Sequence, residues 1–198
     1  VYKSILQQEL DNNSVNWEWV IVLDGIPEPE ELKGLDNVHL IHRDDDEASK
    51  NNIGAMKKKA FGMAQGDLLV DLDHDDMLEP GGIMALVNEA ANHKQAFLYG
   101  DSAGFKPTGE SPILNSKIWS GYERSVGGIK LRFHTPPIPN PYFLSNYLTV
   151  PHQPRAWTQE AYRSLGGFDA MLPVTAEHDL ICRTYAQGIK MVHVPDAR

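Results

Sequence analysis

The stretch Asp67-Leu68-Leu69-Val70-Asp71-Leu72-Asp73-His74-Asp75-Asp76 decides the fold, because a short apolar strand here ends directly in an acidic run. Four carboxylates lie within the six residues 71–76, and like charges at such spacing raise each other's pKa. A divalent cation removes this repulsion, and hard ions such as Mg²⁺ or Mn²⁺ prefer carboxylate oxygen. The stretch therefore predicts a metal site at the carboxyl end of a strand, where open α/β sheets bind ligands. A solvated acidic turn is the open alternative.

Strands and helices alternate on both sides of this stretch, which predicts an α/β fold with a mostly parallel central sheet flanked by helices. The expected strands are 17–23, 38–42, 67–72, 96–99 and 190–194, and the expected helices are 1–10, 47–65, 80–92, 158–165 and 175–187. From residue 102 onward the chain is punctuated by Gly and Pro, so its second half is expected to be irregular and rich in loops. Because the chain opens within a helix rather than a strand, an N-terminal truncation is also expected.

Composition excludes several classes of protein. The chain has 198 residues and a net charge of −9, so a general nucleic-acid surface is not expected. Cys182 is the single cysteine, which rules out an intrachain disulfide and favours an intracellular setting. The sequence contains no apolar run near the roughly 18 residues that span a bilayer. We therefore expect a cytoplasmic location, at the cytoplasmic face of a membrane if segments outside this chain provide an anchor.

Three further stretches carry recognisable patterns. They are Val-Ile-Val-Leu-Asp-Gly at 20–25, the helix and turn at 53–67, and Leu-Gly-Gly-Phe-Asp at 165–169 followed by Glu-His-Asp-Leu at 177–180. Together with Leu-Asp-His-Asp-Asp at 72–76, and in this order, they resemble the family 2 glycosyltransferases of the GT-A fold. The resemblance covers nearly the whole chain. It implies one GT-A-like domain, 1–198, with a nucleotide-sugar half at about 1–101 and an acceptor half at about 102–198.

The resemblance also implies a metal-dependent inverting glycosyltransferase. Such an enzyme moves a sugar from a nucleotide-diphosphate sugar, here with a UDP-sugar as the expected donor, to a hydroxyl of a glycan or other acceptor. Asp24 would contact the base or ribose, and Lys57 would lie near the base or phosphates. Asp73 and Asp75 would form the Asp-any-Asp motif and, with Asp76, hold Mn²⁺ or Mg²⁺. The alternatives are a loop-capping role for Asp24 and a solvated helix face for Lys57.

The expected general base lies in the helix at 175–187. Glu177 and Asp179 are two residues apart, so they point about 200° away from each other and only one can face the donor. Asp179 has a favourable helix partner at i+4, Arg183. Glu177 lies in the first turn after a possible cap at Thr175. We therefore expect Glu177 to be the base, with Asp179 as the other candidate.

Arg155 and Trp157 lie on a strand before the Gly-Gly-Phe-Asp segment and are candidates for acceptor binding. A Trp face stacks well on a sugar ring, and Arg can hold a phosphate. Core packing is the alternative for Trp157.

Two other functions stay open. A nucleotidyltransferase has a similar sheet and a carboxylate-held metal, but usually carries a Gly-rich basic phosphate loop that is not visible here. A non-catalytic nucleotide- or sugar-binding module of the same fold would bind the ligand without turnover.

Overall fold

A computed structural model describes residues 2–8, 10, 15–43, 50–106, 119–148 and 150–198. The strands are β1 (Trp19–Leu23), β2 (Val38–His42), β3 (Leu68–Asp71), β4 (Ala96–Tyr99), β5 (Ser120–Val126), β6 (Ile129–Thr135), β7 (Arg155–Thr158) and β8 (Lys190–His193). The helices are α1 (Tyr2–Leu6), the short 3-10 helix η2 (Glu30–Leu32), α2 (Ile53–Met63), α3 (Gly82–Ala90), α4 (Pro141–Asn146), α5 (Gln159–Ser164) and α6 (Ala176–Ala186). Each expected element is present, but two helices are much shorter than expected: α1 ends at Leu6 rather than at residue 10, and α2 begins at Ile53, with residues 50–52 not helical and residues 47–49 outside the described part of the chain.

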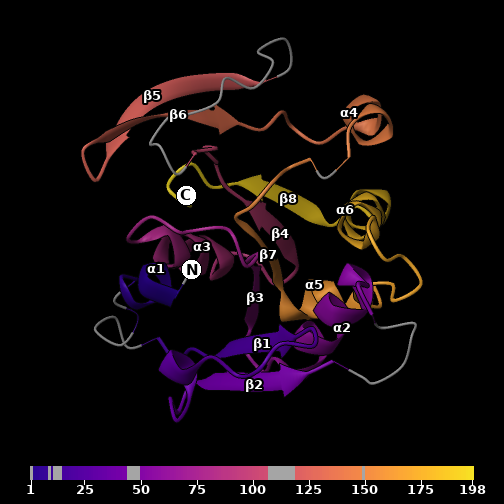
Figure 1. The fold of residues 1–198 in the computed structure, drawn as a ribbon. Coiled ribbons are helices and arrows are strands. Elements are labelled where there is room, and N and C mark those ends of the chain that lie inside the picture. The colour runs from indigo at the N-terminus through magenta and orange to yellow at the C-terminus, as the bar shows by residue number, and fades with distance from the viewer. Residues whose placement is uncertain (1, 9, 11–14, 44–49, 107–118, 149) are drawn as a thin grey trace.

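The strands form three sheets in the described part of the chain. A four-stranded sheet of order β3-β7-β4-β8 lies in the middle, a parallel pair β1-β2 lies below it, and the β5-β6 hairpin lies above it (Figure 1). The hairpin turns through Gly127 and Gly128, which have φ of 56° and 83°, a backbone conformation that favours glycine. The predicted α/β class is confirmed.

The expectation of a mostly parallel central sheet is wrong. β7 lies between β3 and β4 and is antiparallel to both, whereas β4 and β8 are parallel. The four residues of β7, Arg-Ala-Trp-Thr, are all buried, and a strand buried on both faces has no pattern of exposure that depends on its direction. The amino-acid pattern therefore indicated a strand but not its orientation. Because of this orientation, Arg155, the first residue of β7, pairs with Asp71, the last residue of β3.

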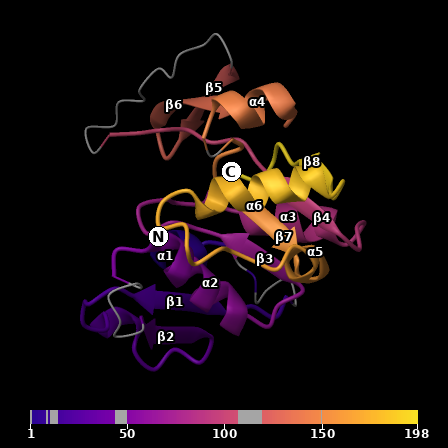
Figure 2. The same ribbon diagram turned by 90° about the vertical axis from the view of Figure 1, so that its right-hand side faces the viewer.

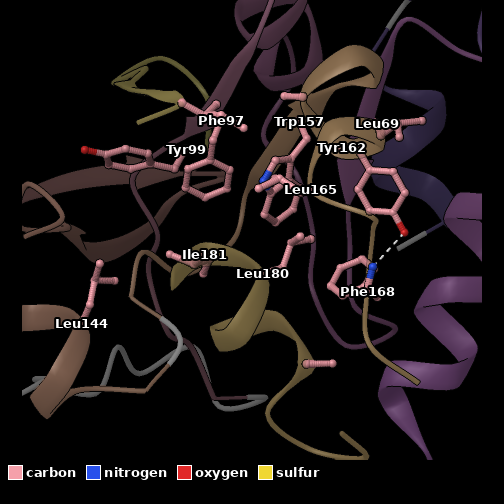
Figure 3. Packing of buried hydrophobic residues seen from close by; sticks show 13 residues of the cluster. Leu69, Phe97, Tyr99, Leu144, Trp157, Tyr162, Leu165, Phe168, Leu180 and Ile181 are labelled. Carbon is pink, nitrogen blue, oxygen red and sulfur yellow. Dashed lines mark hydrogen bonds between the residues drawn. The ribbon is translucent and has the colours of Figure 1, made fainter. Parts of the chain in front are cut away.

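The central sheet is covered on both faces (Figures 1 and 2). Alternate residues of a strand point to opposite faces, so Phe97 and Tyr99 of β4 pack with α5 and α6, while Leu98 packs with α3. Trp157, Phe168 and Leu180 complete the larger of the two cores (Figure 3). This packing fixes β3, β7 and α6 relative to one another, and these are three of the elements that supply the acidic site.

Candidate functional site

Charged side chains from four elements meet at the carboxyl end of β3. Asp71 ends β3 and Asp73 follows it, Arg155 begins β7, Glu177 lies in the first turn of α6, and Lys57 lies on α2. The carboxyl end of β3 and the amino end of the antiparallel β7 lie at the same edge of the sheet. The topology therefore brings together residues that are up to 120 positions apart in the sequence.

Three carboxylates form the centre of this site. Asp71, Asp73 and Glu177 each offer an oxygen, and the three oxygens lie within 4.8 Å of one another, which is close enough for them to surround one cation. Such a donor set fits a hard cation such as Mg²⁺ or Mn²⁺. We call these three residues the acidic triad.

The triad differs from the metal-binding set predicted from the sequence. Of that set, only Asp73 is a member; Asp75 is exposed and Asp76 is partly buried. Asp71 was not predicted as a site residue, although a signal was present. An Asp at the end of an apolar strand is expected to be buried, and a buried charge needs a partner.

Lys57 lies against all three members of the triad. Its Nζ is 2.7 Å from Asp71 Oδ1, 2.7 Å from Asp73 Oδ1, and also contacts Glu177 Oε1. Burial lowers the pKa of Lys57, but attraction to Asp71, and then to Asp73 and Glu177, outweighs burial and the repulsion from Arg155, so the pKa is raised above its ordinary value. The ammonium is therefore held in its charged form inside the site.

Arg155 is the second cation of the site and is completely buried, with 0% of its side chain exposed. Its Nη2 donates to Asp71 Oδ2 at 2.6 Å and to Glu177 Oε1 at 2.8 Å. Burial alone raises the pKa of Asp71, but Arg155 and then Lys57 overcome that effect and the pKa is lowered. Among the described residues, Nε and Nη1 of Arg155 are buried and have no hydrogen-bond partner.

The outer acidic residues have a different electrostatic environment. Burial, with repulsion from Asp73 and then Asp75, raises the pKa of Asp76 to about 6. Burial is also the main cause that raises the pKa of Asp73, despite the opposing attraction of Lys57. Gln153 donates a hydrogen bond to Asp73 Oδ2. This part of the site therefore retains an excess of negative charge that a cation would relieve.

A close contact between α2 and the loop before α6 brings Lys57 to Glu177. The side chain of Asn52 caps α2 by accepting from Ala55 N at 2.9 Å, and its Nδ2 donates to the carbonyl of Ala170 at 2.8 Å. A Cβ on Gly54 would lie 2.5 Å from the Leu172 carbonyl oxygen and 2.9 Å from Ala176 Cβ. Only glycine permits this approach, because two of the three nearest atoms are backbone oxygens.

Asp179 faces away from the triad. It accepts from Arg183 Nε at 2.8 Å, as predicted for an i, i+4 pair, and Arg183 also donates to the carbonyls of Leu165 and Gly167. This arrangement ties α6 to the Gly-Gly-Phe-Asp segment. The cap expected from Thr175 is not formed, since its side chain makes no capping hydrogen bond.

The remaining predicted residues lie outside the triad. Trp157 is fully buried at 0% exposure in the core (Figure 3), and its Nε1 donates to Thr184 Oγ1 at 3.1 Å. No face of its ring is free for a sugar, so its surroundings are those of the core-packing alternative. Asp24 follows β1, and its Oδ1 lies 2.6 Å from Arg43 Nε. Within the described residues, no helix is both long and apolar enough to cross a membrane.

Comparisons with known proteins show the fold. No family model and no curated protein sequence matches the chain. Among solved structures, it is similar to S. aureus TarS 1-349, with a TM-score of 0.65 and 13% identity over 99% of this chain, and to the complex of the same protein with UDP at 12% identity. It is also similar to GalNAc-T7 with UDP, GalNAc and Mn²⁺, with a TM-score of 0.55 and 16% identity over 90% of this chain.

The chain spans 53% of the TarS chain and 36% of the GalNAc-T7 chain. At these identities the comparisons carry the architecture and no further. The described chain has a GT-A-like fold, with the acidic triad at the carboxyl end of β3.

Proposed function

We propose that the chain is the catalytic domain of a metal-dependent inverting glycosyltransferase of family 2. The donor would be a nucleotide-diphosphate sugar, with a UDP-sugar as the first candidate, and the acceptor a hydroxyl group. The observation that carries this proposal is the meeting of Asp73 and Glu177 at one sheet edge in a GT-A-like fold. The UDP in the TarS and GalNAc-T7 structures supports the donor class, and the Mn²⁺ in GalNAc-T7 supports the metal.

The outer acidic residues would hold the metal that accompanies the donor. Asp73, Asp75 and Asp76 offer carboxylate oxygens that suit Mg²⁺ or Mn²⁺. Burial, with repulsion from Asp73 and Asp75, raises the pKa of Asp76, and a bound cation would favour its ionised form. The ion would neutralise the departing diphosphate as its charge develops. Asp24, at the carboxyl end of β1, would contact the base or ribose.

Glu177 would be the general base. In this step the acceptor oxygen forms a bond to the anomeric carbon, the bond from that carbon to the diphosphate breaks, and the proton of the hydroxyl passes to Glu177. Arg155 and Lys57 contact Glu177 Oε1 and so fix where the carboxylate lies. Arg155 would therefore act on the acceptor only through Glu177, because its own side chain is fully buried.

The division of the chain into a nucleotide half and an acceptor half is proposed from the sequence alone. The nucleotide half at about 1–101 contributes Asp24 and the outer acidic residues, and the acceptor half at about 102–198 contributes Glu177. A cytoplasmic location stays a prediction.

The first test is ligand-dependent thermal unfolding with UDP, GDP, CDP and dTDP, each with Mn²⁺ or with EDTA. A ligand that binds only the native state raises the midpoint according to its affinity. We expect one nucleotide, UDP first, to raise the midpoint only when metal is present, and Asp75→Asn to abolish the rise. Nucleotide binding that is equal in EDTA would contradict the metal requirement, and no binding by any nucleotide would contradict the donor site.

The second test separates the two acids of α6. Donor turnover with UDP-sugars is measured for Glu177→Gln and, as the matched control on the same helix, Asp179→Asn. We expect Glu177→Gln to abolish transfer while keeping the nucleotide-induced rise in midpoint, and Asp179→Asn to lower stability while keeping transfer. Equal turnover by Glu177→Gln and the wild type would exclude Glu177 as the base. Release of pyrophosphate from a nucleoside triphosphate would instead identify a nucleotidyltransferase.

A further inference from the structure

We propose that the Lys57 ammonium is the built-in cation of the acidic triad, and that a divalent ion enters the triad only when this side chain is removed. The metal of the proposed transfer is then confined to the outer residues, Asp75 and Asp76 with Asp73. The inference concerns the site of the proposed function, but it depends on cation binding alone. It is therefore tested without nucleotide, donor or acceptor, and either proposal can fail while the other stands.

The first argument is the position of the nitrogen. The oxygens that make the triad a candidate metal site lie within 4.8 Å of one another, and Lys57 Nζ contacts an oxygen of each residue. A metal ion bound to these oxygens would lie about 2.0–2.6 Å from them, against 2.7 Å for Nζ to Asp71 and to Asp73. Two positive charges would then share the same three carboxylates a few ångströms apart, and their mutual repulsion opposes joint occupancy.

The second argument is the balance of charge. The triad carries three negative charges, and Lys57 and Arg155 contribute two positive charges through their ion pairs with it. Little net charge is left to attract a divalent ion into the buried part of the site. Without Lys57 the excess becomes two negative charges, which is the charge that one Mn²⁺ or Mg²⁺ neutralises.

The third argument is that Lys57 has little freedom to leave. Only 13% of its side chain is exposed. The helix that carries it is held against the loop before α6 at Gly54, one turn away, where the fit leaves no room for a Cβ. Withdrawal of the ammonium would leave Asp71, which is 2% exposed, with Arg155 as its other cation. Leaving a buried carboxylate short of a partner is unfavourable.

The experiment is a Mn²⁺ titration of the free protein, followed by electron paramagnetic resonance of unbound Mn²⁺. It compares the wild type with Lys57→Met and with Lys58→Met, the control, because Lys58 is the exposed neighbour on the same helix. We expect Lys57→Met to gain one site that is at least about tenfold tighter than any in the wild type, a change of about 1.4 kcal/mol. Adding Asp71→Asn to Lys57→Met should abolish the gain, and Lys58→Met should behave like the wild type.

Two results would overturn the proposal. One is equal Mn²⁺ affinity of Lys57→Met and the wild type. The other is wild-type binding that Asp71→Asn weakens and Asp75→Asn leaves unchanged, because the ion would then already lie in the triad.

A second measurement covers the case in which Lys57→Met does not fold in EDTA. It is then refolded with and without Mn²⁺, and we expect the ion to restore a cooperative unfolding transition. If Lys57→Met folds in neither condition, the proposal is tested by comparing Mn²⁺ binding of the wild type with that of Asp75→Asn, a change at an exposed position. The proposal requires any Mn²⁺ binding of the wild type to be lost in Asp75→Asn. Persistence of that binding would contradict it.

Discussion

Replacing Asp71 by Asn should destabilise the protein more than any other single change among the acidic residues 71–76. Asp71 is 2% exposed and, among the acidic residues 71–76, is the one carboxylate that binds both buried cations, Lys57 at 2.7 Å and Arg155 at 2.6 Å. An amide of the same shape keeps an acceptor but removes the charge. Arg155, with 0% exposure, then keeps Glu177 as its only ion-pair partner among the described residues.

Removing one partner of a buried ion pair destabilises by about 3–5 kcal/mol. For a chain of this length, each kcal/mol lowers the unfolding midpoint by about 2–4 °C, so the expected loss is about 6–20 °C. The pKa of Asp71 is lowered below its ordinary 3.8, so its contribution is present above that pH and is lost as the pH falls through the folded-state pKa. The gap between wild type and Asp71→Asn should therefore be full at pH 7 and shrink below about pH 4.

The assay is urea unfolding at pH 7 in EDTA, followed by circular dichroism, with thermal midpoints as a second measure. Asp75→Asn is the matched control because it removes the same charge from the same run at an exposed position, and surface changes usually stay within about 0.5 kcal/mol. A loss below about 1 kcal/mol for Asp71→Asn, or a loss equal to that of Asp75→Asn, would refute the reasoning that the buried pairs stabilise this site.

Three further predictions concern stability. Because the folded-state pKa of Asp76 is about 6 against an ordinary 3.8, its ionisation destabilises the fold as the pH rises between these values. Asp76→Asn should therefore unfold at a higher temperature than the wild type at pH 7 in EDTA, with equal midpoints near pH 4. A lower midpoint of Asp76→Asn at pH 7 would contradict this. Gly54→Ala should lower the free energy of unfolding in urea by about 1–3 kcal/mol, because its Cβ meets backbone oxygens. Gly62→Ala on the same helix, where a Cβ meets nothing within 4 Å, should raise it by up to about 1 kcal/mol. Equal effects at the two positions would refute the close-contact argument. Thr184→Val should lose about 1–3 kcal/mol in the same assay, since it leaves Trp157 Nε1 buried without its acceptor, and an unchanged midpoint would show that this bond is not needed.

Much of the fold could be predicted because its signals are local. The apolar run before Asp71 and the helical spacing of α2 indicate a strand and a helix on their own, and both are observed. The pair of Asp179 and Arg183 was predicted from helix geometry and is confirmed. The orientation of β7 could not be predicted in this way, because it depends on where a buried strand enters the sheet.

The site was harder to predict because its contacts are long-range. Lys57 and Glu177 lie 120 positions apart, and no spacing rule connects them. The apolar strand before Asp71 was a signal for its burial, but the cations that pair with it, Lys57 and Arg155, come from α2 and β7 and could not be predicted from that strand. Burial of Trp157 likewise depends on β4 and α6, which pack on it from distant parts of the chain.

Gly54 carries no charge, yet it sets how closely Lys57 approaches Glu177. Lys57 lies three positions after Gly54 on α2, a rise of about 4.5 Å along one face, so a side chain at position 54 that pushes α2 away from the loop before α6 should also displace the ammonium. The same contact touches Ala176, the residue before Glu177. One hydrogen atom in place of a methyl group thus sets the gap between a cation and a carboxylate on two different helices. An uncharged substitution at Gly54 should therefore change the distance between Lys57 and Glu177, and with it the electrostatics of the site. A search for variants with altered cation preference can begin at this position.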